Sequence, residues 1–343
     1  MEKICLKGMS DDELKTWCLK AGQSGYRGKQ LFEWMYHHGI SSFEEMSNVN
    51  KSFRKYLENN CIIQTLEMEK MFPSKVDKST KILFRTTDNQ FIETISMMDK
   101  DRHTVCISSQ IGCALTCGFC ETGRMGLKRN LSTGEIVDQL IFVRENEKQP
   151  ITNVVFMGMG EPFHNYNNVI NAADIFHSPR GFNLAATRIT ISTAGILPQI
   201  QQFIFEKHRY KLAISLNAAN NAVRTKLMPV NKKWPIEDLI REGKKYSNLK
   251  KRQVMFEYVL LKGINDSEDD AHKLAHLLKG IPCKLNIIPY NETDGNYQRP
   301  HEKTIRGFSE ILHNLRDEYR VFVRWSKGQD INAGCGQLAG KQA

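Results

Sequence analysis

Six short runs of β-branched and apolar residues recur between residues 104 and 288, and long stretches with helical periodicity separate them. Parallel strands need crossover connections of this length, whereas a short turn joins only antiparallel neighbours. The pattern therefore predicts a parallel sheet built from βαβ units. The expected strands are Thr104–Ser108, Val154–Met157, Arg188–Ser192, Lys211–Leu216, Gln253–Leu260 and Lys284–Ile288.

Each of these runs ends in small or polar residues, and ligands of parallel α/β folds gather at the carboxyl ends of strands. A closed barrel of eight strands would need two more strand and helix units than the six expected here. We therefore expect an α/β fold with a partial (βα)6 TIM-like barrel over residues 101–330. Its last part should contain a helix, Glu302–Tyr319, and a strand, Val321–Trp325.

The segments that flank the expected barrel have other patterns. The first 70 residues have helical periodicity, with a capping sequence at Ser10 and a helix expected over Arg27–His38, which predicts a small helical domain over residues 1–75. The runs Lys81–Arg85 and Phe91–Met97 are joined by a turn sequence and predict a linking β-hairpin over residues 76–100. Residues 331–343 form a glycine-rich C-terminal segment.

The chain is basic, because 48 Lys and Arg outnumber 38 Asp and Glu and give a formal net charge of +10 over 343 residues. This charge is compatible with a partner that carries phosphates, to which Lys and Arg bind, but it does not identify one. No apolar run approaches the roughly 20 residues of a membrane span, and the charged N-terminus lacks a signal-peptide core, so we expect a cytoplasmic protein without a membrane partner. The candidate phosphate contacts are Lys128, Arg129, Lys244, Lys245, Lys250, Lys251 and Arg252.

Three of the nine cysteines, Cys113, Cys117 and Cys120, lie within eight positions just after the first expected strand. Soft thiolates this close together favour zinc or an iron–sulfur cluster over hard cations. A structural zinc site needs four protein ligands, and His103 or Cys106 is near enough in sequence to supply the fourth. Three thiolates on a 4Fe-4S cluster would instead leave one iron open to a substrate. Spacing alone leaves both possibilities open.

The C-x3-C-x2-C spacing resembles the signature of the radical S-adenosylmethionine (SAM) enzymes. The resemblance implies that Cys113, Cys117 and Cys120 hold a 4Fe-4S cluster and that SAM binds its open iron. Gly160 and Glu161 resemble the Gly-Gly-Glu segment of that superfamily, in which glycine lets the backbone approach the ligand and glutamate pairs with its ammonium group. Further SAM contacts are expected at Ser192, Ser215, Leu216, Asn217 and Asn291.

Several motifs together resemble the RlmN/Cfr family of radical-SAM RNA adenine methyltransferases, over essentially the whole chain. RlmN-type members methylate C2 of an adenine in large-subunit (23S) rRNA and often in tRNA, and Cfr-type members methylate C8 of that rRNA adenine. Pro162 favours the RlmN type and thus C2, whereas Gly126-Leu127-Lys128 is more similar to the Cfr type, which is the alternative. The motifs are Tyr26–Trp34, Cys117–Gly123, Gly126–Leu131, Phe156–Pro162, Lys226–Pro229 and Cys335–Leu338.

Four positions depart from the usual pattern of this family. Glu121 stands where Ala is usual, and Asn217 stands where a Ser-Leu-His segment usually has His. Asn332 and Gly334 stand where Asp and Ala are commoner. Because Asn can form hydrogen bonds but does not titrate, Asn217 could contact a ribose only as a neutral group.

The resemblance also implies how the methyl group moves. One SAM methylates Cys335, and a second SAM, cleaved with an electron from a donor such as flavodoxin or ferredoxin, gives a radical that takes hydrogen from that methyl group. The resulting methylene radical adds to the adenine and joins RNA to protein. Glu93 then accepts the adenine proton, and Cys106 releases the RNA by forming a transient disulfide with Cys335. Two SAM molecules are consumed for each methyl group delivered.

Two other functions agree with parts of the sequence. A radical-SAM activase that oxidises a glycine of a partner protein would explain the cysteine triplet but not Cys106, Cys335 or the net charge. An RNA-binding module stabilised by zinc or a cluster would explain the charge without catalysis. The remaining cysteines have no expected role beyond structure, and they are Cys5, Cys18, Cys61 and Cys283.

Overall fold

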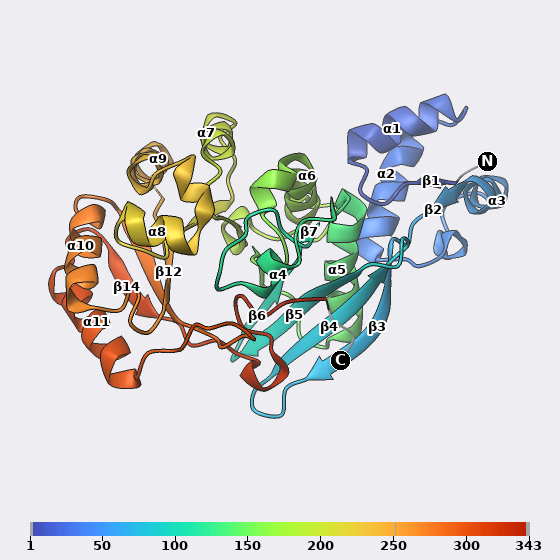
Figure 1. Ribbon diagram of the computed structural model, residues 1–343. Coiled ribbons are helices and arrows are strands. Elements are labelled where there is room, and N and C mark those ends of the chain that lie inside the picture. Colours follow the sequence, from blue (N-terminus) through green and yellow to red (C-terminus); the bar gives the residue numbers. More distant parts are fainter. Residues whose placement is uncertain (1–2, 251, 341–343) are drawn as a thin grey trace.

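A ten-stranded sheet runs through most of the chain in the computed structural model, which describes residues 3–250 and 252–340. The strand order is β14-β13-β12-β11-β10-β9-β6-β5-β4-β3. Every pairing from β6 to β14 is parallel, and every pairing from β3 to β6 is antiparallel. The sheet is therefore part barrel and part antiparallel extension, with β3 and β14 at its two edges (Figure 1).

The parallel part confirms the predicted βαβ units. Six of its strands coincide with the six expected runs, and the strand expected near residue 321 is the seventh. The sheet stays open at β14, as a partial barrel requires. The strands are β6 Arg102–Cys106, β9 Asn153–Phe156, β10 Ile189–Thr193, β11 Lys211–Ser215, β12 Val254–Leu260, β13 Cys283–Pro289 and β14 Arg320–Val323.

Helices on the outer side of these strands form the crossovers (Figure 1). They present an apolar face to the sheet because buried residues recur at helical spacing, as Ile305, Phe308 and Leu312 do in the last one. That last helix ends at Asn314, and its prediction as far as Tyr319 was wrong, because the chain must turn to place buried Tyr319 before β14. The helices are α5 Thr133–Asn146, α6 Tyr166–His177, α7 Leu197–Phe205, α8 Asn221–Leu227, α9 Ile236–Lys250, α10 Glu268–Leu278 and α11 Glu302–Asn314.

The antiparallel extension contains the predicted hairpin and one further strand. Strands β4 Ser79–Thr86 and β5 Phe91–Asp99 pair around the expected turn. A third strand, β3 Leu66–Pro73, corrects the prediction of helical structure through residue 70. Its charged residues alternate with apolar ones and pair across the sheet, since Glu67 accepts a hydrogen bond from Arg85 on β4 at 2.6 Å.

A separate N-terminal unit packs at one end of the sheet (Figure 1). Its helix α1, Asp11–Lys20, begins with the predicted cap, a capping box between Ser10 and Glu13. The helix predicted over residues 27–38 is α2, Tyr26–Phe32, continued by the π-helical turns of η1, Glu33–His38. Helix α3, Lys51–Asn60, follows, and two short parallel strands complete the unit, β1 Ile4–Cys5 and β2 Cys61–Ile62.

The C-terminal segment returns across the open side of the barrel, between β14 and the antiparallel strands (Figure 1). Lys327 donates to the carbonyl of Met98 at 2.9 Å. Asp330 accepts hydrogen bonds from the Ser74 hydroxyl at 2.7 Å and the Lys75 N–H at 2.8 Å. The segment is thus held by side chains and backbone of the extension. None of the described helices is long and apolar enough to cross a membrane.

Candidate active site in the barrel

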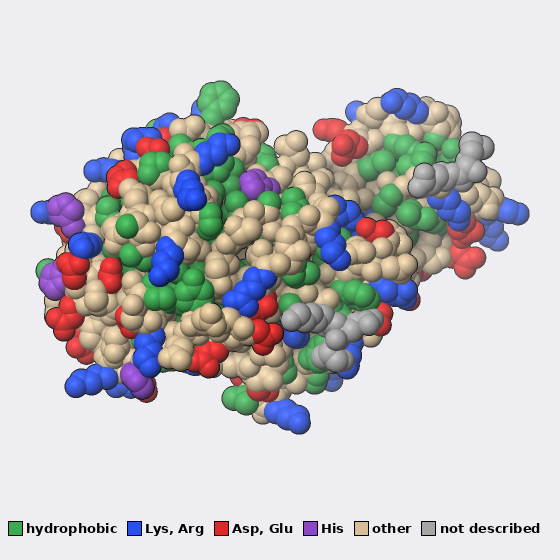
Figure 2. Space-filling model, viewed as in Figure 1, with side chains coloured by type: hydrophobic (Ala, Val, Ile, Leu, Met, Phe, Trp, Pro, Cys, Tyr) green, Lys and Arg blue, Asp and Glu red, His purple; other side chains and the backbone are tan. Residues whose placement is uncertain are grey.

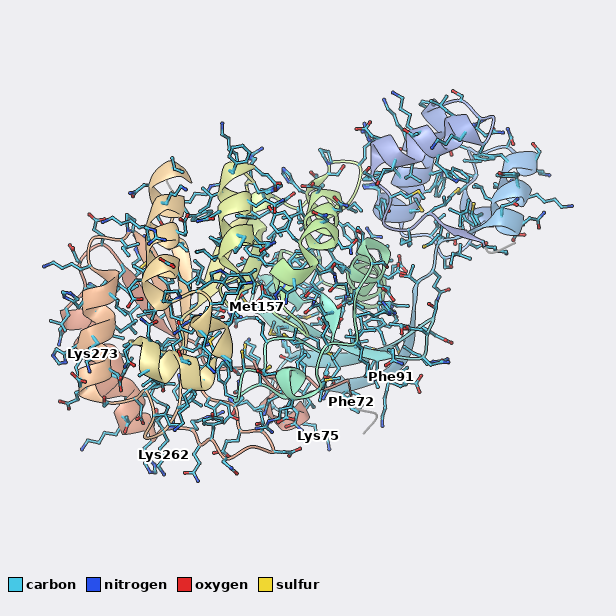
Figure 3. All side chains as sticks on the ribbon, turned by 45° about the horizontal axis from the view of Figure 1, so that its top comes forward. Phe72, Lys75, Phe91, Met157, Lys262 and Lys273 are labelled. Atoms are coloured by element: carbon cyan, nitrogen blue, oxygen red, sulfur yellow. The ribbon has the colours of Figure 1, made fainter. Side chains whose placement is uncertain are left out.

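Two cavities adjoin inside the partial barrel, one of about 380 Å³ and one of about 160 Å³. Met157, which follows β9, and Cys335, in the C-terminal segment, line both of them. Met157 lies near the centre of the molecule (Figure 3). Because two residues form a shared wall, a group carried on one of them can face either cavity.

The loop that carries the cysteine triplet is held together where its two ends meet. Short strands β7, Gln110–Ile111, and β8, Arg129–Asn130, pair on either side of it. Gly112 has φ 73°, and a Cβ there would lie 1.7 Å from the carbonyl oxygen of Gly126, so only glycine fits at this crossing. The Cys113 N–H donates to the same carbonyl at 3.2 Å. The loop therefore starts in one fixed direction.

Cys113, Cys117 and Cys120 all line the smaller cavity, as the sequence predicted for a shared site. Burial raises the pKa of all three thiols, that of Cys113 to about 12, so a positive charge is needed to hold them as thiolates. Among the described residues, no three His, Cys, Asp or Glu side chains converge closely enough to hold one metal ion.

His103, which could have been a fourth ligand, is engaged elsewhere. Its Nε2 forms a hydrogen bond with the Ser96 hydroxyl at 2.9 Å, and its Nδ1 forms one with the Gln149 carbonyl at 2.8 Å. The ring is fully buried and lines neither cavity. The arrangement of the described residues therefore supports a three-thiolate site over the four-ligand zinc alternative.

Gly160 and Glu161 line the same cavity as the three thiols. Gly160 has φ 94°, and a Cβ there would be 2.4 Å from the Cβ of Gln110, so glycine lets the turn pass close to the cysteine loop. The Glu161 carboxylate accepts N–H bonds from Phe163 at 2.9 Å and Ala194 at 2.7 Å. Burial raises its pKa to about 7, and among the described residues no side-chain cation forms an ion pair with it. A ligand ammonium group would supply the missing charge.

Three predicted strand-end residues, Ser192, Ser215 and Asn217, also line the smaller cavity. Asn217 has φ 54°, a left-handed conformation that Asn adopts more readily than most residues. Its Oδ1 accepts a hydrogen bond from the Val259 N–H at 2.8 Å, so the amide links the ends of β11 and β12. Leu216 between them is fully buried and lines neither cavity, so its side chain packs in the core.

Cys335 and Cys106 meet at the larger cavity, which both line. Cys335 is exposed as a residue, although its thiol is enclosed where the two cavities meet, whereas Cys106 on β6 is a buried residue. Burial and the neighbouring Cys335 raise the pKa of Cys106 to about 12, and burial also raises that of Cys335. The carbonyl of Cys335 accepts a hydrogen bond from Asn291 at 3.2 Å, so Asn291 holds the C-terminal segment and does not line either cavity.

Glu93 lies on β5 outside both cavities, and its two carboxylate oxygens are occupied. Oε1 pairs with Lys81 Nζ at 3.2 Å. Oε2 accepts N–H bonds from Ala339 at 2.8 Å and Gly340 at 3.2 Å. Buried Glu93 therefore anchors the C-terminal segment in this conformation.

Sequence reasoning missed three charged residues of the barrel interior. Glu257 on β12 lines the smaller cavity, its Oε1 has no partner, and its Oε2 accepts a 3.4 Å hydrogen bond from Ser192. Arg324 lines the larger cavity just after β14. Arg224 on α8 is fully buried and donates to carbonyls that follow β10 and β11, including Ala194 at 2.6 Å. Glu257 had a signal, since it is the only acid in an apolar run.

The predicted phosphate contacts lie on separate elements and are not one patch. Arg129 on β8 forms ion pairs with Asp88 at 2.6 Å and Glu135 at 2.9 Å, which gives it a structural role. Lys128 donates to Gln90 at 2.6 Å. Lys251 and the side chain of Lys250 lie outside the described residues, and Lys244, Lys245 and Arg252 are on or after α9. Figure 2 likewise shows basic and acidic side chains intermixed on the visible face.

Comparison with known proteins agrees with this geometry. Residues 4–63 match the ribosomal RNA large subunit methyltransferase N-terminal domain, and residues 107–275 match the radical SAM superfamily, whose fold implies a 4Fe-4S cluster and SAM. A crystal structure of a radical SAM methyltransferase from Sphaerobacter thermophilus is 39% identical, has a TM-score of 0.93, and the alignment covers 98% of this chain and 100% of that one.

Two curated relatives carry the name dual-specificity RNA methyltransferase RlmN. The protein of Geotalea uraniireducens is 40% identical over 342 residues, which cover 99% of this chain and 98% of the relative. That of Desulfotalea psychrophila is 42% identical over 349 residues, which cover 98% of this chain and 95% of the relative. With both family models matched and relatives aligned over nearly their whole length, this chain belongs to the RlmN family of radical SAM methyltransferases.

Proposed function

We propose that this protein methylates C2 of an adenine in large-subunit rRNA and in tRNA, with Cys335 as the methyl carrier. The observation that carries the proposal is the position of Cys335 on the wall shared by the two cavities. A methyl group received on the side of the smaller cavity can then be delivered on the side of the larger one. Adenine C2 is poorly accessible in a stacked helix, so the base must be extruded into the larger cavity.

The smaller cavity would hold the cofactors. Cys113, Cys117 and Cys120 would bind the 4Fe-4S cluster, and Gly160 and Glu161 would bind the amino end of SAM. When bound, the cluster and SAM would supply a carbon-centred radical able to remove hydrogen from a methyl group, with an electron from a donor such as flavodoxin or ferredoxin. Ser192 and Ser215 have hydroxyls at strand ends that can bond the remaining polar groups of SAM.

The larger cavity would hold the target adenine between the two thiols of the C-terminal segment and β6. Methyl transfer from SAM leaves a thioether on Cys335, and joining its methylene carbon to adenine C2 makes a protein–RNA adduct. After the adduct has lost the C2 proton and one electron, which the bound cluster would accept, the Cys106 thiolate attacks the Cys335 sulfur and breaks its bond to carbon. The carbon takes a proton and becomes the product methyl group, while the two cysteines form a disulfide.

Glu93 is the proposed proton acceptor, although its oxygens bind Lys81 and the backbone of residues 339–340. Movement of the C-terminal segment breaks the two N–H bonds to Oε2 and frees this oxygen. Since the same segment carries Cys335, withdrawal of the methyl carrier and exposure of the base are then one motion.

The test is to map methylation on 23S rRNA and tRNA treated with the reconstituted protein. We expect 2-methyladenine with the wild type, none with Cys335→Ala, and a trapped protein–RNA adduct with Cys106→Ala. Cys283→Ala is the matched control, because Cys283 is a fully buried thiol on β13 that lines neither cavity. A methyl group found at C8 would assign the Cfr-type reaction instead. Methylated RNA formed by Cys335→Ala at the normal rate would refute the role of Cys335 as methyl carrier.

A further inference from the structure

The parallel strands begin with an unusual set of side chains on the face that lines the barrel interior. Side chains alternate between the two faces of a strand, so residues two and four positions before a cavity-lining residue share its face. Counting back in steps of two from the interior residues Cys106, Ser192, Ser215, Ile288 and Arg324 reaches a cation each time. These cations are Arg102, Arg188, Lys211, Lys284 and Arg320, which we call the barrel-mouth ring.

The charges of the ring are close enough to influence one another. Burial lowers the pKa of Lys211, and the positive charges of Lys284, Arg102 and Arg188 lower it further. Lys211 on β11 and Arg102 on β6 are separated by two strands, so they interact across the barrel interior. Lys284 and Arg320 are register partners on neighbouring strands. The five cations therefore lie together at the end of the barrel where the strands begin.

No acidic side chain neutralises this ring. Among the described residues, none of the five cations forms an ion pair with a carboxylate. Asp99 lies near Arg102, but its carboxylate pairs with Lys327 at 3.3 Å. Lys211 and Lys284 are half-buried, and clustered charges that lose water without a counter-charge destabilise a fold. Such a cluster indicates a site whose counter-charge comes from a ligand.

The ring opens into the larger cavity. Arg102 lines that cavity together with Cys106 and Cys335, so the mouth and the two thiols belong to one continuous space. Four of the cations are in strands β6, β11, β13 and β14, and Arg188 directly precedes β10. Because neighbouring strands lie about 4.8 Å apart, the ring is wider than a single phosphate. A chain of phosphates can contact several of its members at once.

We propose that the barrel-mouth ring binds the phosphate backbone of RNA on either side of the target adenosine and admits that adenosine to the larger cavity from the N-terminal end of the strands. This inference rests on the proposed function and adds the route and the residues by which the RNA enters. The smaller cavity, at the other end of the strands, then stays reserved for the cofactors.

The test compares two double variants with the same loss of charge. Lys211→Gln/Lys284→Gln removes two ring cations, and Lys273→Gln/Lys303→Gln removes two exposed lysines on the outer helices α10 and α11. The probe is a single-stranded RNA oligonucleotide with one adenosine, and its affinity is measured as a function of salt. We expect the ring variant to bind about tenfold more weakly at low salt and to lose about 1.4 from the salt slope, since each single-strand phosphate contact contributes about 0.7.

The control variant should keep wild-type affinity and slope, and both variants should keep wild-type SAM binding and thermal stability close to normal. If the ring variant binds RNA as tightly as the wild type, and the wild type methylates RNA, the proposed role of the barrel-mouth ring is refuted. The proposed function would then still stand. A ring variant that loses affinity only for inorganic phosphate would also refute the role of the ring, because the ring would then be a small-anion site. If the wild type neither binds nor methylates RNA, the proposed function is refuted, and the role of the barrel-mouth ring in RNA binding is refuted with it.

Discussion

Arg324 is a cation whose charge acts on both thiols that we propose for methyl transfer, Cys106 and Cys335. It lines the larger cavity with Cys106 and Cys335, and it lowers the pKa of each against the effect of burial. Glu257 acts in the opposite direction on the same two thiols. Because only a thiolate attacks a methyl group efficiently, these two side chains set the pH at which Cys335 becomes reactive.

Replacing Arg324 should therefore shift the pH profile of Cys335 methylation. Arg324→Met removes the positive charge and so raises the pKa of the Cys335 thiol. The rate of Cys335 methylation then rises only at higher pH, and at neutral pH it falls about tenfold for each unit by which the pKa rises. Arg324→Lys should restore most of the profile, and Glu257→Gln should move it to lower pH. The measurement is the initial rate of methyl transfer from SAM to Cys335 across pH, by peptide mass. Identical profiles for Arg324→Met and wild type would contradict this role.

Sequence reasoning at the residue scale succeeded where a motif fixed the side chain's surroundings. The cysteine triplet and the glycine and glutamate that follow β9 line one cavity, as expected. Glu93 and Asn291 were predicted as site residues, and in this conformation they line neither cavity but bind backbone groups of the C-terminal segment more than 40 residues away in sequence, which no local pattern reveals. Glu257 was missed because a charged residue within a strand gives no indication of which face it occupies.

At the scale of elements, acidic side chains of other elements hold the C-terminal segment in place. Asp77 accepts a hydrogen bond from the Gly328 N–H at 2.8 Å, Asp330 binds the turn between β3 and β4, and Glu93 holds residues 339–340. These contacts keep Cys335 at the barrel while leaving the segment without regular structure apart from η6, Gln329–Ile331. Such a segment can move without disturbing the sheet.

Removing these acidic side chains should make the C-terminal segment more accessible to proteases. In Asp77→Ala/Asp330→Ala, we expect limited proteolysis to cut within residues 326–340 several times faster than in the wild type, together with slower methyl transfer to RNA. Asp317→Ala, an exposed carboxylate before β14, is the control and should leave the cleavage rate unchanged. Equal cleavage rates for all three proteins would mean that the acidic anchors do not restrain the segment.

Helices and strands whose buried residues recur regularly along the sequence were predictable. Elements that form only because they pair with another part of the chain were not. The strands β10 and β13 are buried along nearly their whole length, and both were placed within one residue at each end. Strand β3 has mostly exposed side chains, with only Leu66 buried, so it lacks an apolar run. It is a strand because β4 pairs with it, and that pairing cannot be read from its own residues.

For the whole molecule, the arrangement separates three tasks along the barrel axis. The cysteine loop and strand ends form the smaller cavity, the two thiols lie at the larger cavity, and the barrel-mouth ring lies at the starts of the strands. The net charge of +10 is compatible with an RNA partner but does not show where the RNA binds. The proposed location depends on the arrangement of seven parallel strands around one interior, which brings together cations from far apart in sequence.

The central claim is that Cys335 carries the methyl group between the two cavities. The direct measurement is the mass of the peptide containing Cys335, taken after incubation of the reconstituted protein with SAM and again after addition of RNA and reductant. The account predicts that this peptide gains one methyl group in the first step and loses it to the RNA in the second. Methylated RNA from a protein whose Cys335 never carries a methyl group would contradict it.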